Sequence, residues 1–266
     1  MTNKNCLNCE KELIDQFCSG CGQKSDTHRI TFKNFIFHDV LHGTFHIEKG
    51  IVFTAKQALT RPGKAALDYI SGKRKPYYNV FYLVLIVFGL IIFLGHLFEE
   101  IDLFFGGELE PERPFINEAS RKLARIFDHS KIIIFLFVPF AALNSFILFR
   151  RKKLNLSEHA IISGMILLGM LLISLIGNIL FYANFIIEFT PTFHAIFSWT
   201  VTTLIILHVG YGYINAFRKE YSKFGITYRI LLFFTMIVFE ILILLFIAVG
   251  FVTEWKFGLI NINPFG

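Results

Sequence analysis

Five long apolar blocks limit the fold of this chain more than any other feature. Each block has 18–23 residues and contains at most one His, Asp, Glu, Lys or Arg. About 20 consecutive apolar residues let an α-helix cross the hydrocarbon core of a bilayer. With 54% hydrophobic and 17% charged residues, the chain is also too apolar for an ordinary soluble domain. The sequence therefore predicts an all-α integral membrane protein with a five-helix transmembrane bundle, whose spans are residues 80–98, 132–149, 160–182, 195–217 and 230–252.

The segments between the blocks alternate in charge. Seven basic residues and one acid lie between Lys49 and Lys75, and further basic clusters start at Arg150 and Arg218. Residues 99–130, by contrast, carry eight acids and four bases. Basic residues in every second loop are typical of the cytoplasmic side of a membrane. We therefore expect a multi-pass protein of the bacterial inner (cytoplasmic) membrane, with its N-terminus in the cytoplasm and its C-terminus outside.

All four cysteines lie in the first 21 residues, in two C-x-x-C pairs. Cys6 and Cys9 form the first pair, and Cys18 and Cys21 form the second. This arrangement predicts a cage of four thiolates around one structural zinc ion, in a small zinc ribbon over residues 1–26. Two disulfide bonds are the alternative. A thiolate site requires a reducing compartment, so it also places the N-terminus in the cytoplasm.

The segment between the ribbon and the bundle is predicted to be helical. Residues 27–78 contain apolar side chains at helical spacing, with basic polar faces. Such short amphipathic helices normally lie in the headgroup layer of the membrane. Packing onto the cytoplasmic ends of the spanning helices is the alternative, and the two are compatible. The bundle then occupies residues 79–266.

Four short motifs before the first span accompany the double C-x-x-C pattern: Gly50-Ile-Val-Phe-Thr54, Arg61-Pro62-Gly63, Tyr69-Ile-Ser-Gly-Lys-Arg74 and Tyr77-Tyr78. In this combination the chain resembles a bacterial membrane protein family that is known only as a domain of unknown function. The resemblance covers about the first third of the chain and implies a zinc ribbon joined to a membrane domain. The family carries no established activity. This chain has Glu10 after Cys9, where ribbon knuckles often have Gly, and we expect the change to loosen the first turn without removing a ligand.

A basic segment just before the first span is a candidate site for a lipid phosphate. Each basic residue near an anionic leaflet contributes about 1 kcal/mol, and tyrosines favour headgroup depth. Topology determination and anchoring are the simpler interpretation. The candidate residues are Arg61, Lys64, Lys73, Arg74 and Lys75, followed by Tyr77 and Tyr78.

Polar groups inside the predicted spans define a second candidate site. Glu240 is the only carboxylate deep in a span, and His208 lies at a similar depth on the preceding span. Because polar groups at this depth are costly, we expect Glu240 to share a hydrogen bond with His208 or Tyr211. A proton-handling or ligand-binding role for these three residues is the alternative.

Three histidines form a weaker candidate site. His38, His42 and His46 are four residues apart, a spacing at which histidines on one helix face can bind a metal. The further H-x-x-H-H boxes of the di-iron lipid desaturases are absent from the sequence. An interfacial or packing role is the alternative.

No nucleophile elbow, P-loop or paired-carboxylate motif is visible, so the sequence names no reaction. The ribbon has four acids and three bases, which argues against binding nucleic acid. We therefore expect an adaptor or scaffold whose ribbon binds a protein partner at the cytoplasmic face and whose bundle contacts membrane lipids. The alternative is a lipid-handling membrane enzyme or carrier that uses the basic segment and the Glu240 region. The oligomeric state does not follow from the sequence.

Overall fold

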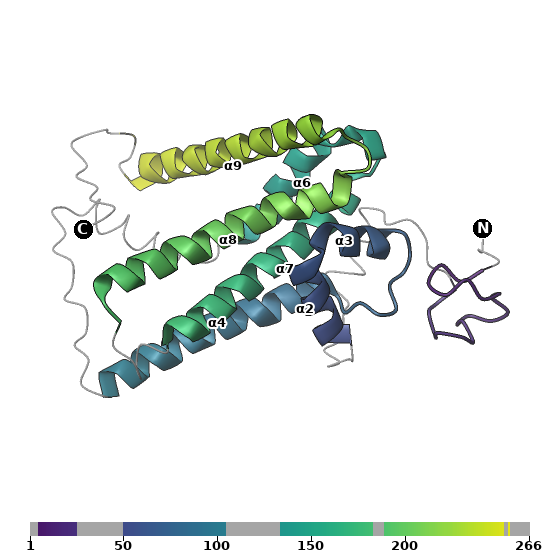
Figure 1. Ribbon diagram of the computed structural model, residues 1–266, viewed down its shortest axis with the longest axis horizontal. Helices are drawn as coiled ribbons and strands as arrows, with labels where there is room; N and C mark the ends of the chain where they lie inside the picture. The colour runs from purple at the N-terminus through teal and green to yellow at the C-terminus, as the bar shows by residue number, and fades with distance from the viewer. Residues whose placement is uncertain (1–4, 26–49, 105–133, 183–188, 253–254, 256–266) are drawn as a thin grey trace.

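The computed structural model describes residues 5–25, 50–104, 134–182, 189–252 and 255 (Figure 1). In these ranges the fold is all-helical, apart from two isolated β-bridges in a small unit of residues 5–25, which we call the cysteine unit. The elements are α2 (Gly50–Thr60), α3 (Pro62–Ile70), α4 (Val80–Phe104), α6 (Phe137–Leu148), the 3₁₀-helix η3 (Arg150–Lys152), α7 (Leu156–Phe181), α8 (Pro191–Phe217) and α9 (Lys223–Val252).

Four of the five predicted spans are confirmed as apolar helices of spanning length. They are Val80–Ile101, Leu156–Phe181, Pro191–Phe217 and Lys223–Phe251. The remaining predicted span, residues 132–149 and second in chain order, is represented by a shorter apolar stretch, Ile134–Leu148, and its first two residues lie outside the described residues. At 1.5 Å per residue these 15 residues measure about 22 Å, which is less than the roughly 30 Å of a hydrocarbon core.

Helix α7 forms the centre of the bundle, because it contacts α2, α3, α4, α6 and α8. Its N-terminus is fixed by a capping box: the Asn155 side chain accepts from the Glu158 N–H, and the Glu158 carboxylate accepts from the Asn155 N–H. Most side chains of its first half are buried. Helices α8 and α9 instead expose many large apolar side chains, such as Leu207 and Leu231, as helices that face lipid would.

Helices α2 and α3 form a hairpin that packs against α7 and α8. A Cβ atom at Gly63 would overlap the carbonyl oxygen of Gly212 and would lie 2.5 Å from the backbone nitrogen of Ala216, so only glycine permits this approach. At the hairpin turn, Tyr211 donates a hydrogen bond from its hydroxyl to the Thr60 carbonyl at 2.9 Å. Residues 50–70 therefore pack onto the bundle, while residues 26–49 of the predicted amphipathic segment lie outside the described residues.

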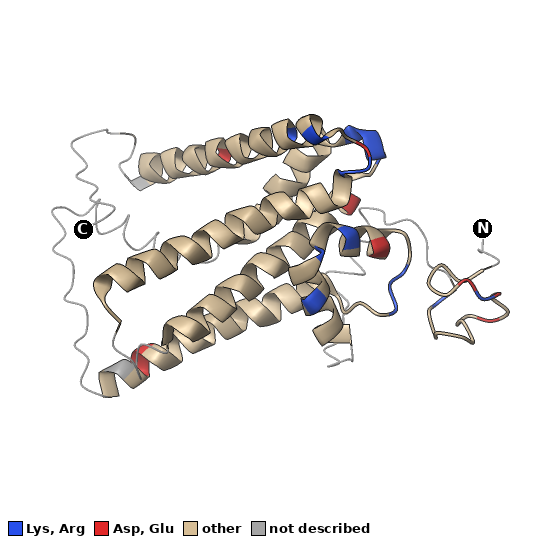
Figure 2. Cartoon of the chain, viewed as in Figure 1, with Lys and Arg blue, Asp and Glu red and all other residues tan. Residues whose placement is uncertain are grey.

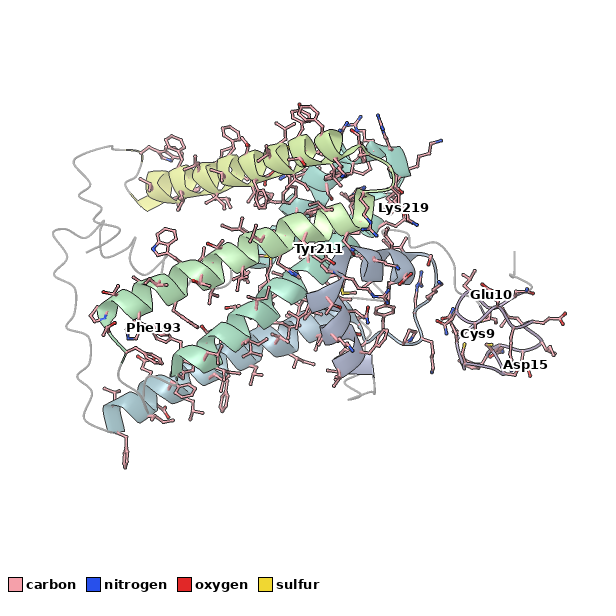
Figure 3. All side chains as sticks on the ribbon, in the orientation of Figure 1. Cys9, Glu10, Asp15, Phe193, Tyr211 and Lys219 are labelled. Carbon is pink, nitrogen blue, oxygen red and sulfur yellow. The ribbon has the colours of Figure 1, made fainter. Side chains whose placement is uncertain are left out.

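The charged side chains are divided between the two ends of the bundle. Lys and Arg gather around η3, the α8–α9 turn and the α3–α4 loop, whereas acids lie on the last turns of α4 at the opposite end (Figure 2). We call the first of these ends the basic end; the cysteine unit lies on the same side of the molecule (Figure 1). Phe193 and Lys219 mark the two ends of α8 (Figure 3). The distribution is the one that alternating loop charges predict.

Candidate functional site

The cysteine unit consists of two knuckles with the same backbone geometry. In the first knuckle, the Cys6 N–H donates to the Lys11 carbonyl at 2.8 Å. In the second, the Cys18 N–H donates to the Gln23 carbonyl at the same distance. The bridges repeat at the same offset of 12 residues, since Asn5 pairs with Glu12 and Phe17 with Lys24. Each C-x-x-C turn is thus closed by its own backbone hydrogen bonds, which direct its two sulfurs toward the other pair.

The four sulfurs are close enough together to hold one metal ion. Cys6 Sγ lies 3.6 Å from Cys21 Sγ, and Cys9 Sγ lies 3.5 Å from Cys18 Sγ. All four sulfur atoms lie within 4.8 Å of one another. A tetrahedral zinc ion with Zn–S bonds of about 2.3 Å would place its ligands about 3.8 Å apart. These separations fit a shared ion and are far longer than the roughly 2.05 Å of a disulfide bond.

Backbone N–H groups stabilise the thiolate form of Cys18. The Gly20 N–H points at Cys18 Sγ, with a nitrogen–sulfur distance of 3.4 Å. Hydrogen bonds from the backbone of Cys21 and Gly20 lower the pKa of the Cys18 thiol to about 6. The thiolate is the form that binds metals. Four thiolate ligands complete a tetrahedral shell and leave no position for a substrate.

The two knuckles differ at the residue that follows the second cysteine. Gly22 has φ +71°, in the left-handed region, and Glu10 has φ +63° at the equivalent position. The N–H groups of both residues donate to the carbonyl of the first cysteine of their pair, at 2.8 Å. The expectation that Glu10 loosens the first turn is therefore wrong. The turn keeps its geometry, and Glu10 adopts a backbone conformation that favours glycine.

The cysteine unit is joined to the membrane domain through Gln23. Its side chain is buried and donates from Nε2 to the Gly72 carbonyl at 2.7 Å. Its Oε1 accepts from the N–H groups of Arg74 at 3.2 Å and Lys75 at 3.3 Å. Leu7 packs against Gly72, where a Cβ atom would lie 2.5 Å from the Leu7 side chain. The four-cysteine cluster is thereby attached to the α3–α4 loop, which carries part of the predicted basic segment.

The predicted lipid-phosphate residues occupy two kinds of environment. Arg61 bonds the Gln57 side chain and lies 3.8 Å from the Asp68 carboxylate. Arg74 lies over the Tyr69 ring at 5.4 Å and donates from Nε to the Tyr69 carbonyl at 3.3 Å. The three lysines of the set are exposed on the surface: Lys64, Lys73 and Lys75. A lipid phosphate at this segment stays a prediction.

Tyr77 and Tyr78 are buried in protein rather than placed at the surface as interfacial anchors. The Tyr77 ring packs edge-on against Phe53 at 5.2 Å and against Tyr69 at 6.1 Å. Burial, followed by the nearby Asp68 carboxylate, raises the pKa of Tyr77 to about 12. Both tyrosines therefore fix the α3–α4 loop.

The structure does not bring His208, Tyr211 and Glu240 together. Glu240 accepts a hydrogen bond from Asn144 Nδ2 at 3.0 Å, because this face of α9 packs on α6. Tyr211 bonds the α2–α3 hairpin at Thr60. His208 is buried against Gly169 of α7, and among the described residues its Nε2 has no hydrogen-bond partner. The three residues of the candidate polar site thus make separate contacts and do not form one site.

Two further hydrogen bonds inside the bundle join α7 to its neighbours. Ser145 of α6 and His159 of α7 are 2.8 Å apart at Oγ and Nδ1, and both are buried. Ser163 of α7 and the hydroxyl of Tyr213 are 3.1 Å apart. The sequence gives no sign of the contact between Ser145 and His159, because the two residues lie in different helices. His38, His42 and His46 lie outside the described residues.

Comparison with known proteins gives one family match. A family model described as "Protein of unknown function (DUF3667)" matches residues 48–92, which include α2, α3 and the first half of α4. No curated protein and no solved structure matches the chain. Within the matched segment, the motif residues have packing roles: Thr54 accepts the Tyr78 N–H at 2.8 Å, and Gly63 permits the approach of α3 to α8.

Proposed function

We propose that this protein is a membrane-anchored zinc-ribbon adaptor, whose cysteine unit binds a protein partner at the cytoplasmic face. The observation that supports it most directly is a pair of large apolar side chains on the segment between the two C-x-x-C pairs. Ile14 is 89% exposed and Phe17 is 57% exposed. Neither contributes to a core, and exposed apolar side chains rimmed by polar residues are typical of protein-binding sites.

The ion in the proposed ribbon is zinc with a structural role. Soft thiolate ligands in a tetrahedral set select zinc over magnesium or calcium. Without the ion, a unit of about 20 residues has too little core to hold two knuckles in place. The display of Ile14 and Phe17 therefore depends on the metal.

The charge of the unit bears on the class of partner. Glu10 and Glu12 precede the apolar pair in sequence and Asp15 lies between its two members; Figure 3 labels Glu10 next to Cys9 and Asp15 at another edge of the unit. Acidic residues on this unit disfavour a phosphate backbone. They favour a protein surface with an apolar groove and a basic rim.

The proposed location is the bacterial cytoplasmic membrane, with the basic end and the cysteine unit in the cytoplasm. Alternating basic loops support this orientation, and a thiolate metal site requires the reducing side. In this topology α6, with the residues before it, is the second of five spans, and the C-terminus lies outside.

Site-specific photo-crosslinking in cells tests the proposal on the full chain. A photoreactive residue at position 14 or 17 should crosslink to the same polypeptide, whereas one at the exposed Ser19 should not. The partner, once purified, should bind the reconstituted protein at least tenfold more weakly after Ile14→Asp, because a charge would enter an apolar contact. Cys18→Ser should abolish the crosslink. Equal crosslinking from position 19, or crosslinking that survives Cys18→Ser, would contradict the proposal.

A further inference from the structure

Two loops that are far apart in the sequence form one basic cluster at the basic end. Residues 150–153 connect α6 to α7, and residues 218–229 include the α8–α9 turn and the start of α9. Together these two stretches contain eight Lys or Arg residues and a single acid, Glu220. Figure 2 shows the basic residues gathered at the tips of these helices. Like charges repel, so a cluster of basic side chains needs either protein groups that hold it in place or an anionic ligand that neutralises it.

Tyr221 lies at the centre of this cluster. Its side chain is buried, and the guanidinium carbons of Arg229 and Arg151 lie 4.2 Å and 4.9 Å from its ring centre. Its hydroxyl accepts the Arg151 N–H at 3.1 Å. Both guanidinium groups therefore lie against one ring. The distance between their carbons cannot exceed the sum of their two distances to the ring centre.

Backbone carbonyls fix the orientation of both arginines. Arg229 donates from Nε to the Leu148 carbonyl at 3.0 Å and from Nη1 to the Gly225 carbonyl at 2.9 Å. Arg151 donates from Nη1 to the Glu220 carbonyl at 3.0 Å. Among the described residues, these are the hydrogen bonds that the two guanidinium groups make. The N–H groups on Nη2 of each arginine are therefore available to donate to a ligand. Two pre-oriented groups lose little side-chain entropy when they bind a ligand.

Protein carboxylates do not neutralise this pair in the described part of the chain. Glu220 forms its ion pair with Lys152, at 2.7 Å between Oε1 and Nζ. Glu158, the next acid along the chain, is buried in the capping box of α7. Each of these two guanidinium groups, held against one ring, offers the N–H donors that a phosphate oxygen accepts.

We infer that Arg151 and Arg229 bind the phosphate of an anionic lipid headgroup at this surface. A lipid fits better than a free phosphate, because the apolar side chains beside the cluster are exposed along one stripe of α9. Phe224 is 85% exposed, and Leu231, about two turns further on, is 63% exposed. Acyl chains would cover this stripe, while the headgroup meets the arginines at the end of the helix. The site lies across the bundle end from the α3–α4 loop and does not depend on the proposed adaptor role.

The test is lipid binding by the full-length protein, measured with native mass spectrometry. Dioleoyl phosphatidylglycerol should bind more tightly than dioleoyl phosphatidylcholine. The double variant Arg151→Lys/Arg229→Lys keeps both charges but loses both planar groups, and it should lower the affinity for phosphatidylglycerol about fivefold. The matched control Arg150→Gln/Arg218→Gln removes two exposed charges from the same loops and should change this affinity less than twofold.

The outcomes separate a built site from general surface charge. Unchanged affinity in the lysine variant together with weaker binding in the glutamine control would overturn the inference in favour of unspecific electrostatics. Equal binding of glycerol 3-phosphate and phosphatidylglycerol would overturn the lipid assignment. If the double variant does not fold, because Arg229 holds the end of α6, the single Arg151→Lys variant must show the loss. Wild-type affinity in that folded single variant would also overturn the inference.

Discussion

At the scale of single residues, Glu10 and Gly22 show what the backbone of a knuckle requires. Both follow the second cysteine of a pair, and both have a positive φ, +63° and +71°. For a residue with a Cβ atom this conformation costs about 1–2 kcal/mol. Glu10 therefore introduces strain into the first turn, which its hydrogen bond to Cys6 and a metal ion shared by the four sulfurs would offset.

We predict that Glu10→Gly tightens metal binding and that Gly22→Ala weakens it. The expected change is about 1 kcal/mol in each direction, reduced for Glu10→Gly by the greater freedom of glycine in the unfolded chain. Gly22→Ala introduces no close contact, because its Cβ would lie 3.7 Å from the nearest atoms of Lys75. Competition with a chelator should rank the affinities Glu10→Gly, wild type, Gly22→Ala. The reverse order would show that backbone strain at the positive φ does not control the metal affinity.

Glu240 illustrates the requirement that a polar group inside a membrane must be paired. Its hydrogen bond to Asn144 connects α9 to α6, and Asn144 is fully buried. Glu240→Gln keeps a hydrogen-bonding oxygen and should be nearly silent in thermal unfolding. Glu240→Leu leaves the Asn144 amide without this partner and should cost about 1 kcal/mol more than Glu240→Gln. A stable Gln variant that nevertheless fails to support growth would point to a chemical role for the carboxyl group.

At the scale of elements, the α2–α3 hairpin depends on glycine where two helices touch. A Cβ atom at Gly63 would overlap the backbone of α8, which cannot move away as a flexible side chain could. Gly63→Ala should therefore destabilise the protein by about 1–3 kcal/mol in detergent. Gly89→Ala on α4 is the matched control, because nothing lies within 4 Å of its Cβ position, and alanine should be neutral or slightly stabilising there. Equal melting temperatures for the two variants would contradict this account of the packing.

Sequence patterns predicted the features that consecutive residues determine and missed the contacts between residues that are far apart in the chain. Apolar length predicted the spans of α4, α7, α8 and α9, and C-x-x-C spacing predicted the cluster of Cys6, Cys9, Cys18 and Cys21. These properties are set by consecutive residues. The partner of Glu240 could not be predicted, because depth in a span does not tell which neighbour a helix face meets. The contacts of Gln23 with the α3–α4 loop could not be predicted either, because an amide near a cysteine pair cannot be told in sequence from any polar surface residue.

At the scale of the whole molecule, Gln23 connects the metal site to the membrane domain. The knuckle that contains Cys18 and Cys21 also fixes the backbone of Gln23, whose carbonyl accepts the Cys18 N–H. The side chain of Gln23 then holds Gly72, Arg74 and Lys75 of the α3–α4 loop. Loss of the ion should therefore affect a loop that contains no metal ligand.

We predict that metal removal exposes this loop to trypsin. Chelation should loosen the second knuckle, withdraw the Gln23 side chain and increase cleavage after Lys73 or Arg74 in the reconstituted protein. Lys75 is followed by Pro76 and is no trypsin site. Gln23→Ala should reproduce the increase with the metal still bound, because it removes the three hydrogen bonds without touching a ligand.

Gln16→Ala is the control, since the Gln16 side chain is exposed. The Gln16 backbone carbonyl, which accepts from Ser25, is kept in this variant. Cleavage after Lys219 in the same digest should not change, because the α8–α9 turn does not depend on the cysteine unit. Two outcomes would contradict this coupling: a loop as resistant after chelation as before, or a Gln23→Ala variant that behaves like Gln16→Ala. The cysteine unit and the membrane domain would then be independent bodies, and the proposed adaptor role would rest on the ribbon alone.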